Sequence, residues 1–226
     1  MSMQPVLDLT ISAAPQVYDW LRDAILRGEL PPGSRLSEGE IGKQIGVSRQ
    51  PVREAFIRLT SEGLAEVRPQ RGTFISRISL SAVLSARLIR EAVESDLIRM
   101  VCDRADDALL SRLDREIEMQ RAAIDRDDIE EFVRLDDRFH FLLASAAEQE
   151  AVWTVLEGLK SHMNRLRHIT ARAFDARRLT DQHAAIVEGL RQRDADAAEQ
   201  AMRLHLRELL ADLPEVASSR PELFTK

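Results

Sequence analysis

The sequence predicts a mainly α-helical protein, in which an N-terminal winged helix-turn-helix is followed by an all-helical bundle of about six helices. Two observations predict this fold class. Residues 37–76 combine helix-capping and turn signals with two short runs typical of β-strands. Residues 77–213 contain no proline and only two glycines, Gly158 and Gly189, while apolar residues recur with a helical period. The predicted domains are residues 1–77 and residues 78–226.

The composition is that of a globular chain whose two predicted domains differ in charge. Of the 226 residues, 44% are hydrophobic and 31% are charged, and the formal net charge is −6. Residues 1–77 carry ten basic and nine acidic residues, whereas residues 78–226 carry 22 and 29. Within residues 35–77 there are eight basic and five acidic residues, so positive charge collects around the predicted helix-turn-helix.

Three further features bear on the cellular compartment. A single cysteine, Cys102, excludes an intrachain disulfide framework. No apolar run approaches the ~18 residues that a membrane span requires. The first fourteen residues lack the basic segment of a signal peptide. We therefore expect a cytoplasmic protein with no membrane partner.

The first two helices are predicted from their end signals. A first helix begins at Pro15 and ends at Gly28, and its apolar residues are expected to complete the N-terminal core. The segment Pro31-Pro32-Gly33 then breaks the chain. Ser37 and Glu40 have the spacing of a capping box, which predicts a short second helix with Ser37 as its N-cap.

A tight turn and a third helix follow. Gly46 supplies the left-handed backbone that such a turn needs, Ser48 is placed to cap the next helix, and Pro51 fits only within its first turn. Apolar residues at i, i+4 and i+7 of this helix are expected to face the core, namely Val52, Phe56 and Leu59.

The opposite face of the third helix presents Arg49, Gln50 and Arg53. Arginine pairs with guanine edges or phosphates and glutamine pairs with adenine, so this face suits the major groove of DNA. The alternative is a solvated basic face without a partner. Gly63 ends the helix, and residues 65–68, 69–72 and 73–76 then read as strand, turn and strand, which is a wing. The wing favours DNA binding over the solvated face.

The N-terminal third resembles the GntR family of regulators. The matching motifs are Leu36-Ser37-Glu38, Gly46-Val47-Ser48-Arg49, Pro51-Val52-Arg53-Glu54-Ala55, Glu62-Gly63-Leu64 and Pro69-x-Arg71-Gly72. The resemblance implies base and phosphate contacts from the third helix and a wing tip that approaches a minor groove. The DNA-binding residues that it implies are Ser48, Arg49, Gln50, Arg53, Arg71 and Gly72.

Two glycines in the second predicted helix depart from the family pattern. Gly39 stands where the family commonly has an arginine that touches DNA, and Gly42 stands where alanine is usual. Each glycine costs roughly 1 kcal/mol of helix stability relative to alanine. We therefore expect the second helix to be less stable and its contact with DNA to be weaker.

The second domain is predicted to contain helices near residues 80–103, 106–125, 128–147, 150–173, 176–192 and 195–213, joined at Arg77–Ser81 to the first domain. Ala217–Lys226 is predicted to be a poorly ordered polar tail. Ionisable residues interrupt the apolar stripes of three of these helices. Asp136 and His140 lie one turn apart on one stripe, and His183 and His205 replace core residues on two others.

His183 and His205 are equally far from the turn near residues 193–194, so an antiparallel helical hairpin brings them level. One carboxylate and three imidazoles form a ligand set suited to Zn²⁺, Ni²⁺ or another first-row divalent ion such as Mn²⁺ or Fe²⁺. The alternative is that each histidine is hydrogen-bonded within the core.

The second half resembles the C-terminal effector (FCD) domain of FadR-like GntR regulators, in which Asp-x-x-x-His and two later histidines bind a metal. The resemblance implies that Asp136, His140, His183 and His205 are the metal ligands, with zinc as the leading ion. Arg90 and Glu94 also match this domain, either as an ion pair or as part of an effector pocket. We predict Arg90 and Arg165 as effector-binding residues.

These patterns predict a homodimeric transcriptional repressor that binds a palindromic operator and responds to a small organic acid or sugar acid. The alternative function is a metalloenzyme that acts on a small carboxylate and carries a DNA-binding domain. No nucleophile triad, phosphate loop or nucleotide fingerprint is found in the sequence, and no carboxylate is assignable as a general base beside the metal. We therefore expect a regulator and not an enzyme.

Overall fold

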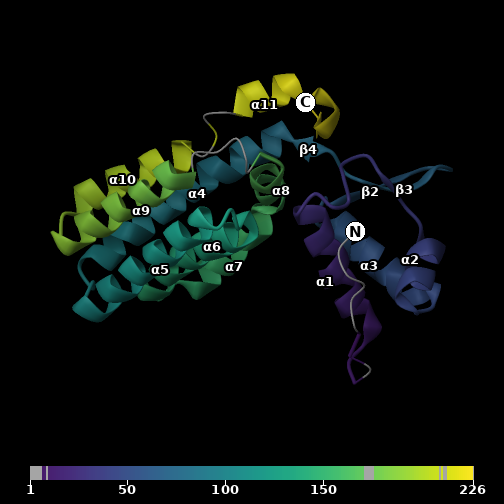
Figure 1. Ribbon diagram of the computed structural model, residues 1–226, viewed down its shortest axis with the longest axis horizontal. Coiled ribbons are helices and arrows are strands. Elements are labelled where there is room, and N and C mark those ends of the chain that lie inside the picture. The colour runs from purple at the N-terminus through teal and green to yellow at the C-terminus, as the bar shows by residue number, and fades with distance from the viewer. Residues whose placement is uncertain (1–6, 9, 171–175, 209, 211–212, 226) are drawn as a thin grey trace. The chain divides into compact units, whose positions relative to one another are not determined.

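The computed structural model describes residues 7–8, 10–170, 176–208, 210 and 213–225. It confirms the predicted fold class, since helices dominate the chain and the few short strands lie near its N- and C-terminal parts (Figure 1). The chain divides into two compact units. The first contains residues 1–80, 161–169 and 219–226, and the second contains residues 81–160 and 170–218. The first unit thus includes two segments that the sequence assigned to the second domain.

The first unit contains the winged helix-turn-helix. Its helices are α1 (Ala13–Leu26), α2 (Glu38–Ile45) and α3 (Arg49–Ser61), and its wing is formed by β2 (Ala65–Arg68) and β3 (Gly72–Ile75). A short strand, β1 (Arg35–Leu36), pairs with β3, so the antiparallel sheet has the order β1-β3-β2.

The turn between α2 and α3 has the predicted chemistry in part. Gly46 has a φ of 76°, and the Ser37 side chain accepts a hydrogen bond from the Glu40 backbone N–H at 3.4 Å. Ser48 precedes α3 with extended backbone, but its side chain makes no capping hydrogen bond. The predicted cap from Ser48 is therefore wrong, and α3 is fixed by its buried face instead. Val52, Phe56 and Leu59 are all buried in the core of this unit, as predicted.

The second unit is a helical bundle that follows the predicted order (Figure 1). Its helices are α4 (Leu80–Cys102), α5 (Asp107–Asp125), α6 (Ile129–Ala146), α7 (Glu150–Leu159), α9 (Ala176–Arg191) and α10 (Ala195–Glu208). No helix in the described part of the chain is long and apolar enough to cross a membrane.

The helix predicted over residues 150–173 is divided into two. The helix α7 ends at Leu159, Lys160 is its C-cap, and α8 (Ser161–Thr170) begins directly after it. The buried Lys160 ammonium lies 3.0 Å from Asp137 Oδ1 and 4.0 Å from the ring centre of Trp153. These contacts fix the end of α7. The predicted end of this helix lies outside the described residues.

The C-terminal tail is more ordered than predicted. The helix α10 ends at Glu208, and α11 (Leu213–Ser219) and a 3-10 turn (Pro221–Leu223) precede β5 (Phe224–Thr225). This last strand pairs in parallel with β4 (Ile78–Ser79). Leu223 and Phe224 are buried, so two apolar side chains and a strand pairing fix a segment whose overall composition is polar.

The hairpin of α9 and α10 is packed closely enough to set its register (Figure 1). A Cβ placed on Gly189 of α9 would lie 2.7 Å from the backbone nitrogen of Ala198 on α10. Only glycine allows this approach without a shift of the backbone. The close packing fixes the level of His183 relative to His205.

Candidate functional site

The predicted DNA-reading side chains lie together on the exposed face of α3. Arg49, Gln50 and Arg53 are all exposed, and we call this set the recognition surface. Arg53 Nε lies 3.5 Å from Glu38 Oε1, and Gln50 Nε2 donates to Glu54 Oε1 at 2.8 Å. Exposed pairs of this kind contribute at most about 1 kcal/mol. These pairs are therefore weak enough to be exchanged for contacts with DNA.

The wing tip is shaped by residues in the left-handed region of backbone space. Gln70 has a φ of 61° and Gly72 a φ of 107°, and the exposed Arg71 lies between them. A Cβ on Gly72 would lie 3.3 Å from Arg35 Nε, so the position is both strained and crowded for any other residue. The turn thus presents Arg71 at the tip of the wing.

The structure gives different reasons for the two unusual glycines of α2. A Cβ on Gly42 would lie 2.8 Å from the backbone oxygen of Val47, so the helix-turn-helix approaches this position too closely for a side chain. A Cβ on Gly39 would lie 3.5 Å from Arg49 Nη2, which is an ordinary contact. Gly42 is therefore required by packing, whereas Gly39 leaves room beside the recognition surface.

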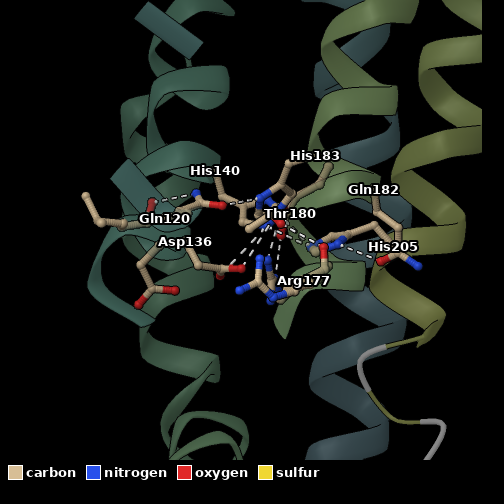
Figure 2. Close-up of polar contacts among 12 residues, drawn as sticks. Gln120, Asp136, His140, Arg177, Thr180, Gln182, His183 and His205 are labelled. Atoms are coloured by element: carbon tan, nitrogen blue, oxygen red, sulfur yellow. Dashed lines mark hydrogen bonds and ion pairs between the residues drawn. The ribbon is translucent and has the colours of Figure 1, made fainter. Parts of the chain in front are cut away.

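Four buried side chains converge inside the second unit (Figure 2). Asp136 and His140 come from α6, His183 comes from α9 and His205 comes from α10. Their potential ligand atoms all lie within 4.8 Å of one another. We call these residues the four-residue cluster. Among the described residues, this cluster is a group of histidine and carboxylate side chains close enough together to hold a metal ion.

The imidazoles of the cluster point their Nε2 atoms at one another. His205 Nε2 lies 3.2 Å from both His140 Nε2 and His183 Nε2. His183 Nε2 is also 3.6 Å from Asp136 Oδ1. Lone pairs of three neutral imidazoles repel at such separations unless a proton or a cation lies between them. The donor set of three nitrogens and one carboxylate fits a first-row divalent ion.

The opposite nitrogen of each imidazole faces an acceptor. His183 Nδ1 is 2.8 Å from Gln120 Oε1, and His205 Nδ1 is 3.2 Å from Gln182 Oε1. His140 Nδ1 lies 2.6 Å from Glu94 Oε2. An acceptor at Nδ1 places the proton there and leaves a lone pair on Nε2. Hydrogen bonds therefore orient the rings of His183 and His205 for ligation, and a close contact with the Glu94 carboxylate positions the ring of His140.

Sequence reasoning missed the contribution of Gln120. Its amide nitrogen donates to the backbone oxygen of Leu135 at 3.2 Å, and this bond turns Oε1 toward His183. Gln120 is fully buried on α5, three residues after the buried Ile117. A glutamine at a core-facing helical position was the available signal, because a buried amide requires partners.

The charges around the cluster favour a neutral His205 and an ionised Glu94. The pKa of His205 lies well below its usual value because of burial and the neighbouring His183 and His140. Burial alone would raise the pKa of Glu94, but Arg90 and His140 outweigh it and hold that pKa below the usual range. Neutral imidazole is the form that binds a metal.

Arg90 lies beside the cluster on α4 and is 1% exposed. Its Nε atom donates to Glu94 Oε1 at 2.5 Å, and Nη2 lies 3.3 Å from Glu94 Oε2. Its Nη1 atom is buried and has no hydrogen-bond partner among the described residues. The guanidinium thus retains donor capacity that an anion could satisfy.

Arg165, which was predicted to bind the effector, belongs to the first compact unit. It is fully buried on α8 and donates from Nη2 to the backbone oxygen of Ser76 at 2.6 Å. Burial lowers its pKa to about 10. On the same helix, His162 Nδ1 accepts from the Ser79 backbone N–H at 3.3 Å, and burial together with Arg165 lowers the His162 pKa to about 4. The structure therefore places Arg165 in the first compact unit, whereas the four-residue cluster belongs to the second.

Comparisons with protein families agree with this architecture. Residues 13–75 match the family described as bacterial regulatory proteins, gntR family, and residues 86–208 match the FCD domain. The chain is 35% identical over 230 residues to the HTH-type transcriptional repressor RspR of Escherichia coli K12, with both chains covered completely. It is 29% identical to the HTH-type transcriptional repressor NanR of Klebsiella aerogenes, over 90% of this chain and 86% of NanR.

Solved structures share the fold. A transcriptional regulator GntR from Rhodococcus sp. RHA1 is 25% identical, with a TM-score of 0.75 over 91% of this chain and 99% of that one. McbR/YncC of Escherichia coli also has a TM-score of 0.75, at 21% identity, over 91% of this chain and 98% of that one. Both the DNA-binding fold and the helical domain are thus found together in other proteins.

Proposed function

We propose a mode of action for this chain, which belongs to the GntR family of bacterial regulatory proteins and is a DNA-binding transcriptional regulator. The protein acts as a homodimeric repressor. Its winged helix-turn-helix reads a palindromic operator, and its helical domain binds a divalent metal and a small organic acid or sugar acid. The acid changes the affinity for the operator. Residues 1–77 bind DNA, and residues 78–226 bind the metal and the acid. Within the second range, α8 and β5 belong to the first compact unit.

The recognition surface supplies the contacts to DNA. Arg49, Gln50 and Arg53 are exposed on the first turns of α3, where side chains of a recognition helix reach base edges in the major groove. Ser48, directly before the helix, lies within reach of a phosphate. Arg71 and Gly72 at the wing tip approach the adjacent minor groove.

One observation supports the proposed metal centre. Three Nε2 atoms and the Asp136 carboxylate meet in a buried cluster, and a side-chain oxygen lies beside the other nitrogen of every imidazole. We propose Asp136, His140, His183 and His205 as the ligands and zinc as the leading ion, with nickel, manganese and iron as the other candidates. A bound ion would supply Lewis acidity and positive charge at this point.

The acid binds beside the metal and to Arg90. The unpartnered Nη1 atom of Arg90 is a buried cationic donor, and a carboxylate satisfies it with a charge-assisted hydrogen bond. Four protein ligands leave positions available on an ion of higher coordination number. A small acid with one carboxylate and further hydroxyl groups meets both requirements.

An exposed apolar face on α4 supports dimer formation. Leu84 and Leu88 are 49% and 60% exposed and lie one turn apart on the same side of the helix. Contiguous exposed apolar surface marks an interaction site. Regulators of the GntR family typically dimerise, so we assign this face to a second copy of the chain.

The helix α8 connects the two functions. It follows directly after Lys160, which is paired with Asp137, the neighbour of the proposed ligand Asp136. Further along α8, Arg165 holds the backbone of Ser76 at the start of the linker. A change in packing around the metal is thereby transmitted along one continuous peptide to the linker. Such coupling requires that the acid bind one arrangement more tightly than another.

The test is a titration of operator DNA with and without candidate acids, after the metal content has been measured. We expect His183→Ala and His205→Ala to lose metal and to make DNA binding insensitive to the acid, while operator recognition persists. Footprinting of the wild type should show a palindrome protected by two subunits. A full acid response in metal-free variants would contradict the proposed centre. Consumption of the acid would favour the metalloenzyme alternative.

A further inference from the structure

The three imidazoles of the four-residue cluster are held in two different ways. His183 and His205 face neutral amide oxygens, those of Gln120 and Gln182. His140 faces the Glu94 carboxylate, at 2.6 Å. The Glu94 side chain is only 4% exposed, so its charge acts on His140 with little screening by water.

We propose that Glu94 is a positioning residue for the metal ligand His140, and that its negative charge, beyond its capacity to accept a hydrogen bond, strengthens metal binding. This inference rests on the proposed metal centre. A carboxylate beside the Nδ1–H of a ligating histidine fixes the ring and increases the basicity of Nε2. An amide oxygen provides the orientation but lacks the charge.

Arg90 is the residue that allows Glu94 to remain charged inside the domain. It contacts Glu94 through Nε at 2.5 Å and through Nη2 at 3.3 Å. An isolated carboxylate would be costly at this depth, whereas a paired one is tolerated. The pair lies on one face of α4, one turn apart. A role for the pair in helix stability alone would predict effects on unfolding but none on the metal affinity of the folded protein.

Glu94→Gln separates charge from hydrogen bonding, because glutamine has the same length and retains an acceptor oxygen. The matched control is Glu116→Gln, since Glu116 is 3% exposed on α5 and is paired with Arg138 at 3.2 Å. We expect zinc affinity, measured by competition with a chromophoric chelator at constant pH, to fall about 10- to 100-fold in Glu94→Gln. Glu116→Gln should retain the wild-type affinity.

Glu94→Gln leaves Arg90 without its anionic partner, so folding is controlled with the double variant Arg90→Met/Glu94→Gln. This variant contains no unpaired buried charge at the pair and should show the same loss of zinc affinity. Glu94→Asp provides the conservative comparison. It retains the charge and is expected to bind zinc more tightly than Glu94→Gln does. Substitution with Co²⁺ gives an absorption spectrum that reports the ligand field of the whole metal site, which should differ between Glu94→Gln and the wild type.

The outcomes distinguish this inference from the proposed function. If the wild type binds no metal, the proposed centre is wrong and the proposed role of Glu94 is wrong as well. If the wild type binds zinc and folded Glu94→Gln binds it equally well, the centre stands and the inference is overturned. Weaker binding by Glu94→Asp than by Glu94→Gln would also overturn it, because length would then matter more than charge.

Discussion

The recognition surface and the four-residue cluster show two opposite ways of holding functional side chains. Arg53 is 65% exposed and its Nε lies 3.5 Å from Glu38 Oε1, so its removal should change the free energy of unfolding very little. His183 and His205 are buried, and each is in contact with several polar groups of the bundle. The proposed function is therefore separable from folding in the first region and joined to it in the second.

Metal binding should give the largest effect, because it acts on a site built into the core. An ion at 1,000 times its dissociation constant stabilises the folded state by about 4 kcal/mol. We expect zinc to raise the thermal midpoint of the wild type and to leave those of His183→Ala and His205→Ala nearly unchanged. The measurement is thermal unfolding of metal-stripped protein with and without zinc.

A matched control is His162→Ala, which alters a histidine of the other compact unit. This variant should keep the full zinc response. A zinc-induced shift that survives in both His183→Ala and His205→Ala would show that the stabilising ion binds elsewhere.

Removal of the Arg49 or Arg53 side chain should have a smaller effect, confined to the affinity for operator DNA. Arg49→Ala and Arg53→Ala are each expected to weaken operator binding by about 1 to 3 kcal/mol, the cost of a lost bidentate base contact. Their thermal midpoints should stay at the wild-type value because both side chains are exposed. The measurement is operator affinity at several salt concentrations.

The control for these variants is Arg121→Ala, an exposed arginine of the bundle whose Nη2 atom lies 3.1 Å from Asp181. It should bind operator like the wild type. Unchanged affinity and salt dependence in both Arg49→Ala and Arg53→Ala would remove α3 from the DNA interface.

The hydrogen bond from Arg165 on α8 to the Ser76 backbone provides a test of whether the four-residue cluster is coupled to the recognition surface. Arg165→Met removes the hydrogen bond to the Ser76 backbone, and methionine suits a buried position. We expect metal content and acid binding to persist while the acid loses its effect on operator affinity, a change of about 1 to 2 kcal/mol. The measurement is the operator titration with and without acid.

Arg177→Met is the control, since Arg177 is exposed and paired with Asp125 at 2.6 Å. It should leave the acid response intact. A normal response in Arg165→Met would exclude this contact from the path between the regions.

The sequence was sufficient for features fixed by local chemistry. Gly46 and the Ser37 cap define the helix-turn-helix within a few residues, and the helical stripes place Asp136 and His140 on an inward face. The closeness of His183 to His205 can also be predicted, because a short connection between two antiparallel helices fixes which of their residues lie opposite each other. Each of these predictions involves residues within one or two turns of helix or across one short connection.

Features that depend on distant segments were not predicted. The pairing of β5 with β4 joins residues that lie far apart in the sequence, and two-residue strands give no periodic signal. The contact of Arg165 with Ser76 spans 89 residues. The apolar pattern of residues 150–173 also continues across Lys160, so it gave no sign that the helix is divided there.

The two glycines of α2 offer the smallest effect and the finest comparison, because the same substitution should act in opposite directions three residues apart. Alanine is favoured over glycine in a helix interior by roughly 1 kcal/mol. At position 39 the new Cβ would meet Arg49 Nη2 at 3.5 Å, an ordinary contact, so Gly39→Ala should stabilise α2 by up to about 1 kcal/mol.

At position 42 the new Cβ would lie 2.8 Å from the Val47 backbone oxygen, and relieving that clash must distort the turn that Gly46 defines. We expect Gly42→Ala to destabilise the helix by about 1 kcal/mol, as overpacking outweighs the gain in propensity. Hydrogen exchange of the α2 backbone amides measures both changes in the intact protein. Slower exchange in both variants would show that the turn tolerates a methyl group, and that Gly42 is a matter of helix propensity alone.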